Sequence, residues 1–496
     1  MKKYNVFKVL LIALFVAIIC SFLIPQSKVG YTGIEKGMIN PITFIDSVSN
    51  GLTSFSVFIA SFVYIISIGI FYSVLKKSGK YDVVINNTAF KFKNRKKAFL
   101  IISILTLGFL TAVIGDVMPA LIFVPAFIDI ARKLGFDSKK AILSTVGAVI
   151  IGSANSLYTN YTNQILATTV STNIIVKVIA LFVSFIVLVL FAIFGKKPEE
   201  VKLEKENVKK GSLISIAFDI ILVLIIIGMV NWKAYFGFEG FSKFHTSVIE
   251  FKLFKISVFN ALLGTSLVAF GEWTIYSLIV LLIVVSVILA LIYKVGFDGL
   301  FESISNGVRK SLPYAMILIL ANVILVGVYN SGFFITIISS IAKMKDQVLS
   351  CTTISALSAL VYPDYTYANQ FTLSTLSILV TKKALFSVFA ITFQLIYSLM
   401  LLISPTSVLV LMALRYEDVR YKDWFKYIYK LFLGLLIIFF MIIMIVGGKY
   451  IRTVSYIVLA VLIVILVLFV VLCLTKKNLK VEAKKETAKK KNSKKK

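Results

Sequence analysis

The sequence predicts an all-α polytopic membrane protein, and its composition and hydropathy pattern are the reasons. Hydrophobic residues make up 59% of the 496 residues and charged residues only 15%, whereas about a quarter of a soluble domain is charged. The apolar residues form repeated blocks of about 20, the length of helix that crosses the hydrocarbon core of a bilayer. The clearest blocks are 6–24, 51–75, 173–195, 212–231, 273–293 and 456–474.

The composition also argues against other classes of protein. The net charge of +30 does not indicate a nucleic-acid partner, because the Lys and Arg residues lie in the connections between spans. Three cysteines, Cys20, Cys351 and Cys473, are far apart in apolar stretches, so we expect neither a disulfide nor a metal site. One histidine, His245, cannot build a catalytic triad or a zinc site. We expect no enzyme and no tightly bound cofactor.

The positive charges predict the orientation in the membrane. With the N-terminus inside and the spans alternating, the inside segments hold 39 Lys and Arg and the outside segments hold 12. This bias predicts a multi-pass protein of the cell membrane with both termini in the cytoplasm. Residues 476–496 contain eleven Lys and two Glu, which is typical of a disordered tail that contacts anionic lipid or is merely solvated.

A helical hairpin is predicted in the first half. Because the segments on both sides of 98–130 are basic and inside, this apolar stretch must enter and leave on the cytoplasmic side. Its two arms meet at Gly115 and Asp116, where the glycine and a nearby proline interrupt a helix. The next span, 141–172, is broken by the polar run 152–163. Such a run is tolerated at membrane depth only beside a cavity or inside protein.

The second half repeats this order in the opposite sense. A span at 312–328 precedes a hairpin at 348–380, whose tip contains Asp364 and whose flanking lysines lie outside. The following span, 384–414, is broken at residues 404–407. An inverted repeat with broken helices is typical of a secondary transporter whose substrate site lies at the midplane between the halves.

The predicted organisation has six parts. They are an N-terminal span with its external loop (1–50), a first repeat (51–195), a cytoplasmic linker with connecting spans (196–311), a second repeat (312–448), a last span (449–475) and the tail (476–496). The alternative from another class is a non-transporting membrane scaffold or lipid-contacting protein. A scaffold, however, has no use for polar backbone at the midplane.

Two carboxylates occupy corresponding positions, Asp116 at the first hairpin tip and Asp364 at the second. A charge at bilayer depth is costly and faces a partner or water. Both are therefore candidates to bind a coupling cation, Na⁺ or H⁺, or a cationic group of the substrate. The alternative is that they only cap helix starts at the interface.

Polar residues at the breaks and at the second tip are candidate substrate ligands, because broken helices expose backbone N–H and C=O groups there. They are Ser153, Asn155, Ser156, Thr366, Ser404, Pro405, Thr406 and Ser407. Hydrogen bonding between helices is the alternative role for such residues.

The second break and the residues after it resemble a known family. The run Ile403-Ser-Pro-Thr-Ser-Val, followed by Tyr421-Lys-Asp-Trp424, is similar to the closing motif of YfcC-like and DcuC-like carriers of the ion transporter superfamily. Residues 297–310 and, more loosely, 108–165 also resemble this family. The resemblance implies paired hairpins, broken helices and a homodimer, and it implies a binding role for the residues 404–407.

The same resemblance implies cation-coupled transport of C4-dicarboxylates in one branch and exchange of basic amino acids in another. This sequence departs from the family pattern at the second tip, where tyrosines replace glycines and Asp364 is added. It departs again at Val408, where the family has glycine. The family's substrate therefore cannot be carried over directly.

The charges at the predicted site favour a substrate with a positive group. Neither tip and neither break contains Lys or Arg, whereas two carboxylates are present. We expect an amino acid, with a basic one favoured, and keep a C4-dicarboxylate as the alternative, because helix N-termini and bound Na⁺ can hold an anion. The tyrosines 362, 365 and 367 are candidates for a cation–π box or for interfacial anchors.

Overall fold

The prediction of an all-α polytopic membrane protein is confirmed. The computed structural model describes residues 5–30, 33–195, 197–203, 212–253, 256–257, 261, 264, 268–380, 382–465 and 467. Eight helices in these ranges are long and apolar enough to cross a membrane. They are α1 (Asn5–Leu23), α3 (Ile59–Lys77), α5 (Lys96–Ile114), α10 (Ile174–Ile193), α15 (Ile275–Ile292), α16 (Phe297–Ser331), α21 (Phe386–Met400) and α23 (Tyr421–Gly447). The spans that contain α21 and α23 include an adjoining 3₁₀ turn and cover Lys383–Met400 and Tyr421–Tyr450.

Shorter elements connect or extend these helices. The helices among them are α2 (Phe44–Val57), α4 (Tyr81–Lys91), α6 (Val124–Lys133), α7 (Ser138–Ile142), α8 (Ala148–Ala154), α9 (Asn160–Leu166), α11 (Ser212–Met229), α12 (Trp232–Phe236), α13 (Gly240–Glu250), α17 (Phe333–Ile341), α18 (Gln347–Val361), α19 (Tyr365–Ala368), α20 (Ser374–Leu379) and α22 (Val408–Tyr416). The described strands form two antiparallel pairs, β1 (Ser27–Gly30) with β2 (Gly33–Lys36) and β3 (Lys252–Leu253) with β4 (Ile256–Ser257).

The first predicted hairpin is present. α5 ends at Gly115, whose φ of 80° is the left-handed conformation that favours glycine. The returning arm is the 3₁₀ turn η2 (Pro119–Ile122) followed by α6. Tyr64 of α3 donates to the carbonyl of Met118 at 2.8 Å. Tyr72, two turns further along α3, donates to the carbonyl of Ile122 at 2.7 Å, so the returning arm runs alongside α3.

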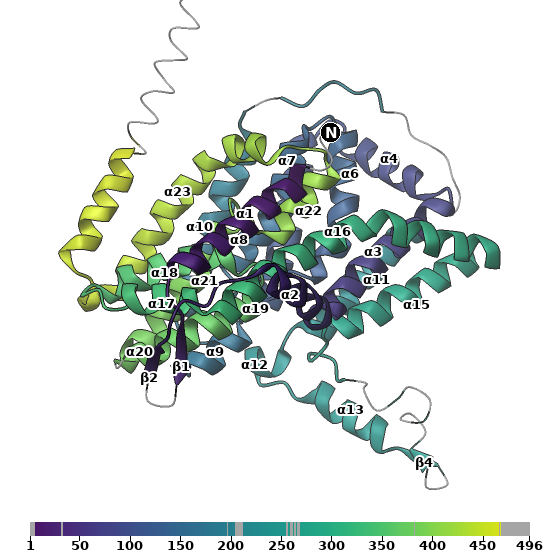
Figure 1. The fold of residues 1–496 in the computed structure, drawn as a ribbon. Helices are drawn as coiled ribbons and strands as arrows, with labels where there is room; N and C mark the ends of the chain where they lie inside the picture. Colours follow the sequence, from purple (N-terminus) through teal and green to yellow (C-terminus); the bar gives the residue numbers. More distant parts are fainter. Residues whose placement is uncertain are drawn as a thin grey trace, which may run out of the picture.

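The second predicted hairpin joins α18 to an arm made of α19, a π-helical turn (Asn369–Leu373) and α20. Asp364 at its tip caps α19 by accepting the N–H of Tyr367 at 3.0 Å. The end of the arm contacts α17 and β2. This hairpin therefore opens toward the end of the molecule that carries the β1–β2 pair (Figure 1).

Both predicted breaks are present as well. Residues 155–159 are non-helical between α8 and α9, and residues 401–407 are non-helical between α21 and α22. The backbone at these points is inside the protein, because Asn155 and Ser404 are fully buried. Polar backbone at this depth thus meets protein groups, as the absence of water in a bilayer requires.

Segments predicted to share one side of the membrane gather at one end of the molecule. Lys77 pairs with Glu302 at 2.5 Å, and Arg132 pairs with Glu417 at 3.2 Å. Figure 1 shows α4, α7 and the start of α1 at this end, with β1, β2, α12 and α13 at the other. These contacts place the four predicted inside segments at the same end of the molecule. From the positive charges we predict that this end faces the cytoplasm.

Three boundaries differ from those expected. The span expected at 51–75 is divided at Phe58, where no Gly or Pro marks the end of α2. The span expected at 312–328 continues an amphipathic stretch, so that α16 has 35 residues and contains Pro313. At 1.5 Å per residue this helix is about 50 Å long, so it extends beyond a hydrocarbon core of about 30 Å. Of the last expected span, the structure describes a helix over Thr453–Ile465, and the tail 476–496 lies outside the described residues.

Glycines allow helices to pack closely at two places. A Cβ on Gly307 of α16 would lie 2.5 Å from the Cα of Ile70 in α3. A Cβ on Gly152 of α8 would lie 2.3 Å from the carbonyl oxygen of Gly108 in α5. Because glycine has no side chain, two helix backbones can approach closely within a membrane. Here the two glycines let α16 pack against α3, and α8, which ends at the first break, pack against α5 of the first hairpin.

Candidate functional site

The hairpin tips and the breaks surround one cavity of about 480 Å³, which we call the central cavity. Asp116 and Asp364 both line it, one from each hairpin. The breaks contribute Ser153 and Ser407, and the second tip adds Thr366. The structure therefore brings together five of the residues that the sequence nominated, including both carboxylates.

The charged groups of the central cavity are all acidic. Asp116 accepts the N–H of Met118 at 2.9 Å, so this carboxylate, like that of Asp364, caps a turn while it faces the cavity. Glu272, which the sequence did not single out as a ligand, supplies a third carboxylate. No Lys or Arg is among the described residues that line the cavity.

Three buried polar atoms of the lining have no hydrogen-bond partner among the described residues. They are the Oγ of Ser407, the Oγ1 of Thr159 and the Oδ1 of Asn322. Buried polar groups in proteins are almost always paired, so three such atoms make this cavity a candidate site for a polar solute. Asn322 was missed, although a lone amide in the apolar middle of a span is a signal that sequence alone provides.

A helix N-terminus also meets the central cavity. α22 begins at Val408, and Ser407, Val408 and Leu409 all line the cavity. The first N–H groups of a helix have no partner inside the helix and form the positive end of its dipole. The cavity thus offers acidic side chains for a cationic group and a helix N-terminus for an anionic group.

The other predicted residues of the second break support the cavity without lining it. Ser404 donates from Oγ to the carbonyl of Ala359 at 2.7 Å. Thr406 Oγ1 lies 3.3 Å from the same carbonyl oxygen and 3.2 Å from that of Leu360. Pro405 lies between them in sequence and is not part of the lining. These contacts pair the carbonyls at the end of α18 and attach the break to the second hairpin.

Asn155 and Ser156 of the first break likewise form internal bonds. The Nδ2 of Asn155 donates to Ser184 Oγ at 3.3 Å, and Ser156 Oγ donates to the carbonyl of Tyr158 at 2.7 Å. Gln394 of α21 donates from Nε2 to the carbonyl of Ser156 at 2.6 Å. This buried glutamine, which the sequence analysis did not single out, connects the first break to the second broken helix.

The tyrosines beside Asp364 do not form a ring around it. Tyr365 lines the central cavity, and its ring packs against Tyr397 at a centroid distance of 5.5 Å. Tyr362 is buried and accepts at its carbonyl from Tyr397 at 2.6 Å, while Tyr367 packs against Phe58. Of the three candidates for a cation–π box, only Tyr365 is in a position to contact a solute.

This chain is similar to several known membrane transport proteins. A family model described as DcuC, C4-dicarboxylate anaerobic carrier, matches residues 2–448. Among solved structures, the YdaH transporter of Alcanivorax borkumensis is 12% identical, with a TM-score of 0.39 over 91% of this chain and 100% of that one. MtrF of Neisseria gonorrhoeae, from a class of antimetabolite efflux pumps, is 12% identical, with a TM-score of 0.39 over 88% of this chain and 94% of that one. A comparison with curated protein sequences gave no match.

Proposed function

Because the chain belongs to the C4-dicarboxylate anaerobic carrier family, it is a secondary transporter, and we propose that it moves a small polar organic solute by alternating access. It is a multi-pass membrane protein and not an enzyme. In this proposal the coupling ion is Na⁺ or H⁺, and Asp116 and Asp364 receive it or the cationic group of the solute.

The observation that carries the choice of solute is the sign of the charges in the central cavity. Three carboxylates, those of Asp116, Asp364 and Glu272, line it together with the N-terminus of α22. A zwitterion satisfies both features, because its ammonium group can meet a carboxylate and its own carboxylate can meet the helix N-terminus. We therefore favour an amino acid as the solute. A basic amino acid is favoured in particular, because the cationic group of its side chain can pair with another of the three carboxylates.

A C4-dicarboxylate is the second candidate, and the description of the family supports it. Such a solute needs its negative charge balanced. The N-terminus of α22 would hold one carboxylate, and Na⁺ or H⁺ bound at Asp116 or Asp364 would remove the repulsion from the cavity.

Uptake into proteoliposomes will distinguish these candidates. We expect the purified chain to accumulate arginine, ornithine or lysine under an imposed Na⁺ or H⁺ gradient, with weaker uptake of aspartate and succinate. Strong succinate uptake with no response to any cationic amino acid would select the dicarboxylate instead. A chain that moves none of these solutes under either gradient would support the scaffold alternative.

The proposal includes an inverted arrangement of the two hairpins in the cell membrane, with both termini in the cytoplasm. A Met344→Cys variant in which the native cysteines are replaced by serine should react with an impermeant thiol reagent only from outside the cell. Reaction only from the cytoplasm would contradict the arrangement. A homodimer, which we also propose, would double the mass of the protein measured in detergent by light scattering.

A further inference from the structure

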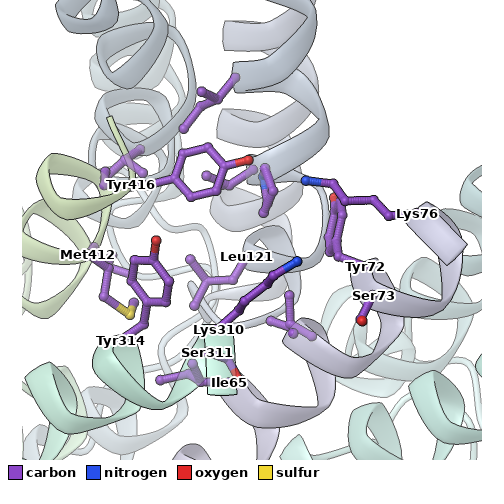
Figure 2. A pocket seen from close by; sticks show the side chains of 18 residues that line it. Ile65, Tyr72, Ser73, Lys76, Leu121, Lys310, Ser311, Tyr314, Met412 and Tyr416 are labelled. Carbon is purple, nitrogen blue, oxygen red and sulfur yellow. The ribbon is translucent and has the colours of Figure 1, made fainter. Parts of the chain in front are cut away.

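A second pocket, of about 330 Å³, adjoins the central cavity at the end of the molecule that carries α4 and α7. Its walls come from α3 and α6 of the first half and from α16 and α22 of the second. We call it the lysine pocket, because Lys76 of α3 and Lys310 of α16 are its charged lining residues. Figure 2 shows both lysines extending their ammonium ends toward the middle of the pocket.

The polar groups of the lysine pocket that remain available are hydrogen-bond donors. No described carboxylate forms an ion pair with Lys76 or Lys310, and Tyr314 has no hydrogen bond to the described residues. Lys76 Nζ lies 5.5 Å from the centroid of the Tyr81 ring, a contact that leaves its N–H groups able to donate. The hydroxyl of Tyr416 is already engaged, since it donates to Asp129 Oδ1 at 2.8 Å.

The carboxylate of Asp129, which accepts from Tyr416, has a second partner. Its other oxygen accepts from Tyr81 at 2.8 Å, and it is not part of the lining. The lysine pocket therefore presents two ammonium groups in a mainly apolar wall, and none of the described residues that line it is a carboxylate, which suits an oxyanion.

The lysine pocket shares part of its wall with the central cavity. Four apolar residues line both spaces and form the layer between them: Ile65, Leu121, Leu409 and Met412. Leu409 belongs to the first turn of α22, the helix whose N-terminus faces the central cavity, so a displacement of α22 would change this layer. A solute that leaves the central cavity in this direction enters the lysine pocket next.

We propose that the lysine pocket is a second binding site on the transport path, which receives the carboxylate group of the solute between the central cavity and the predicted cytoplasmic face. This inference rests on the proposed function. The carboxylates of the central cavity and the ammonium groups of the lysine pocket would then bind opposite ends of a zwitterion in turn. Both lysines are exposed, so the contribution of each to binding is modest.

Transport measured from the two sides of the membrane tests the proposal. In membrane vesicles of opposite orientation, Lys76→Met and Lys310→Met should each raise the KM for arginine or lysine about fivefold when the solute is supplied at the lysine face. The KM from the opposite face should not change. Lys77→Met is the matched control, because Lys77 is adjacent, does not line the pocket and pairs with Glu302 at 2.5 Å. An unchanged KM in both orientations, or an equal rise in both, would overturn the proposal.

A binding measurement keeps this test separate from the proposed function. In phosphatidylcholine nanodiscs, the full chain should bind two molecules of arginine or lysine, and the double variant Lys76→Met/Lys310→Met should bind one. Agmatine, which is arginine without its carboxylate, should occupy only one site. If the wild type transports nothing but shows these stoichiometries, the second site stands and the transport function fails. A single bound molecule per wild-type chain would overturn the proposal, because the lysine pocket would then bind no solute. If the lysine substitutions change binding only when anionic phosphatidylglycerol is present, the pocket binds a lipid phosphate instead, and the proposal is also overturned.

Discussion

Replacing Asp364 with asparagine should lower solute uptake at least about 100-fold while the protein still folds. The carboxylate lines the central cavity at the second hairpin tip, and the described lining residues include no Lys or Arg that would compete with a cationic group for it. Removing the carboxylate that pairs with a desolvated cation weakens the binding free energy by about 3 kcal/mol or more, which corresponds to a loss of about 100-fold in affinity. Asparagine caps helices as well as aspartate does, so the bond to the N–H of Tyr367 at 3.0 Å should persist.

The measurement is the initial rate of arginine and succinate uptake under Na⁺ and H⁺ gradients, together with the melting temperature. Asp46→Asn is the matched control, because Asp46 also caps a helix, in a capping box with Thr43, and does not line the central cavity. Equal uptake by Asp364→Asn and the wild type would remove Asp364 from the site. Loss of arginine uptake with retained succinate uptake would assign Asp364 to the cationic end of the solute.

The arrangement of the hairpins and breaks could be predicted because helix-breaking residues and charges mark them. Gly115 stands at the first turn, and Ser404 and Pro405 stand at the second break, each in the middle of an apolar stretch. The division at Phe58 could not be predicted in this way, since the backbone departs from helical geometry there, with φ of −102° and ψ of 17°, without any such residue. Long-range packing rather than local sequence therefore decides where α2 ends.

The site could be predicted in outline but not in its individual contacts. Sequence shows that Ser404, Thr406 and Ser407 lie at a break, but not which way each side chain points. In the structure, Ser404 and Thr406 bond the end of α18, whereas Ser407 lines the cavity and its hydroxyl has no partner in the described part of the chain. Glu272 and Asn322 come from helices and connections outside both predicted tips, so only the three-dimensional fold brings them to the cavity.

Gly115 is the residue at which adding a single methyl group should most reduce transport and stability. Its φ is 80°, and an added Cβ would lie 2.1 Å from the carbonyl oxygen of Tyr158 and 3.1 Å from Ser156 Oγ. The left-handed conformation alone costs about 1–2 kcal/mol for other residues. The overlap adds to this, and the atom that must move is backbone of the first break, which forms the wall of the central cavity beside Asp116.

We therefore expect Gly115→Ala to abolish uptake and to lower the melting temperature. Gly79→Ala separates the two causes, because Gly79 also has a positive φ, of 66°, but an added Cβ there would meet nothing within 4 Å. Gly79→Ala should show only the conformational cost of about 1–2 kcal/mol and should keep its uptake. If the two variants lose the same stability and both transport normally, the first tip and the first break do not need their close contact. In that case the central cavity does not depend on the geometry at Gly115, and the transport site must be sought away from the first hairpin.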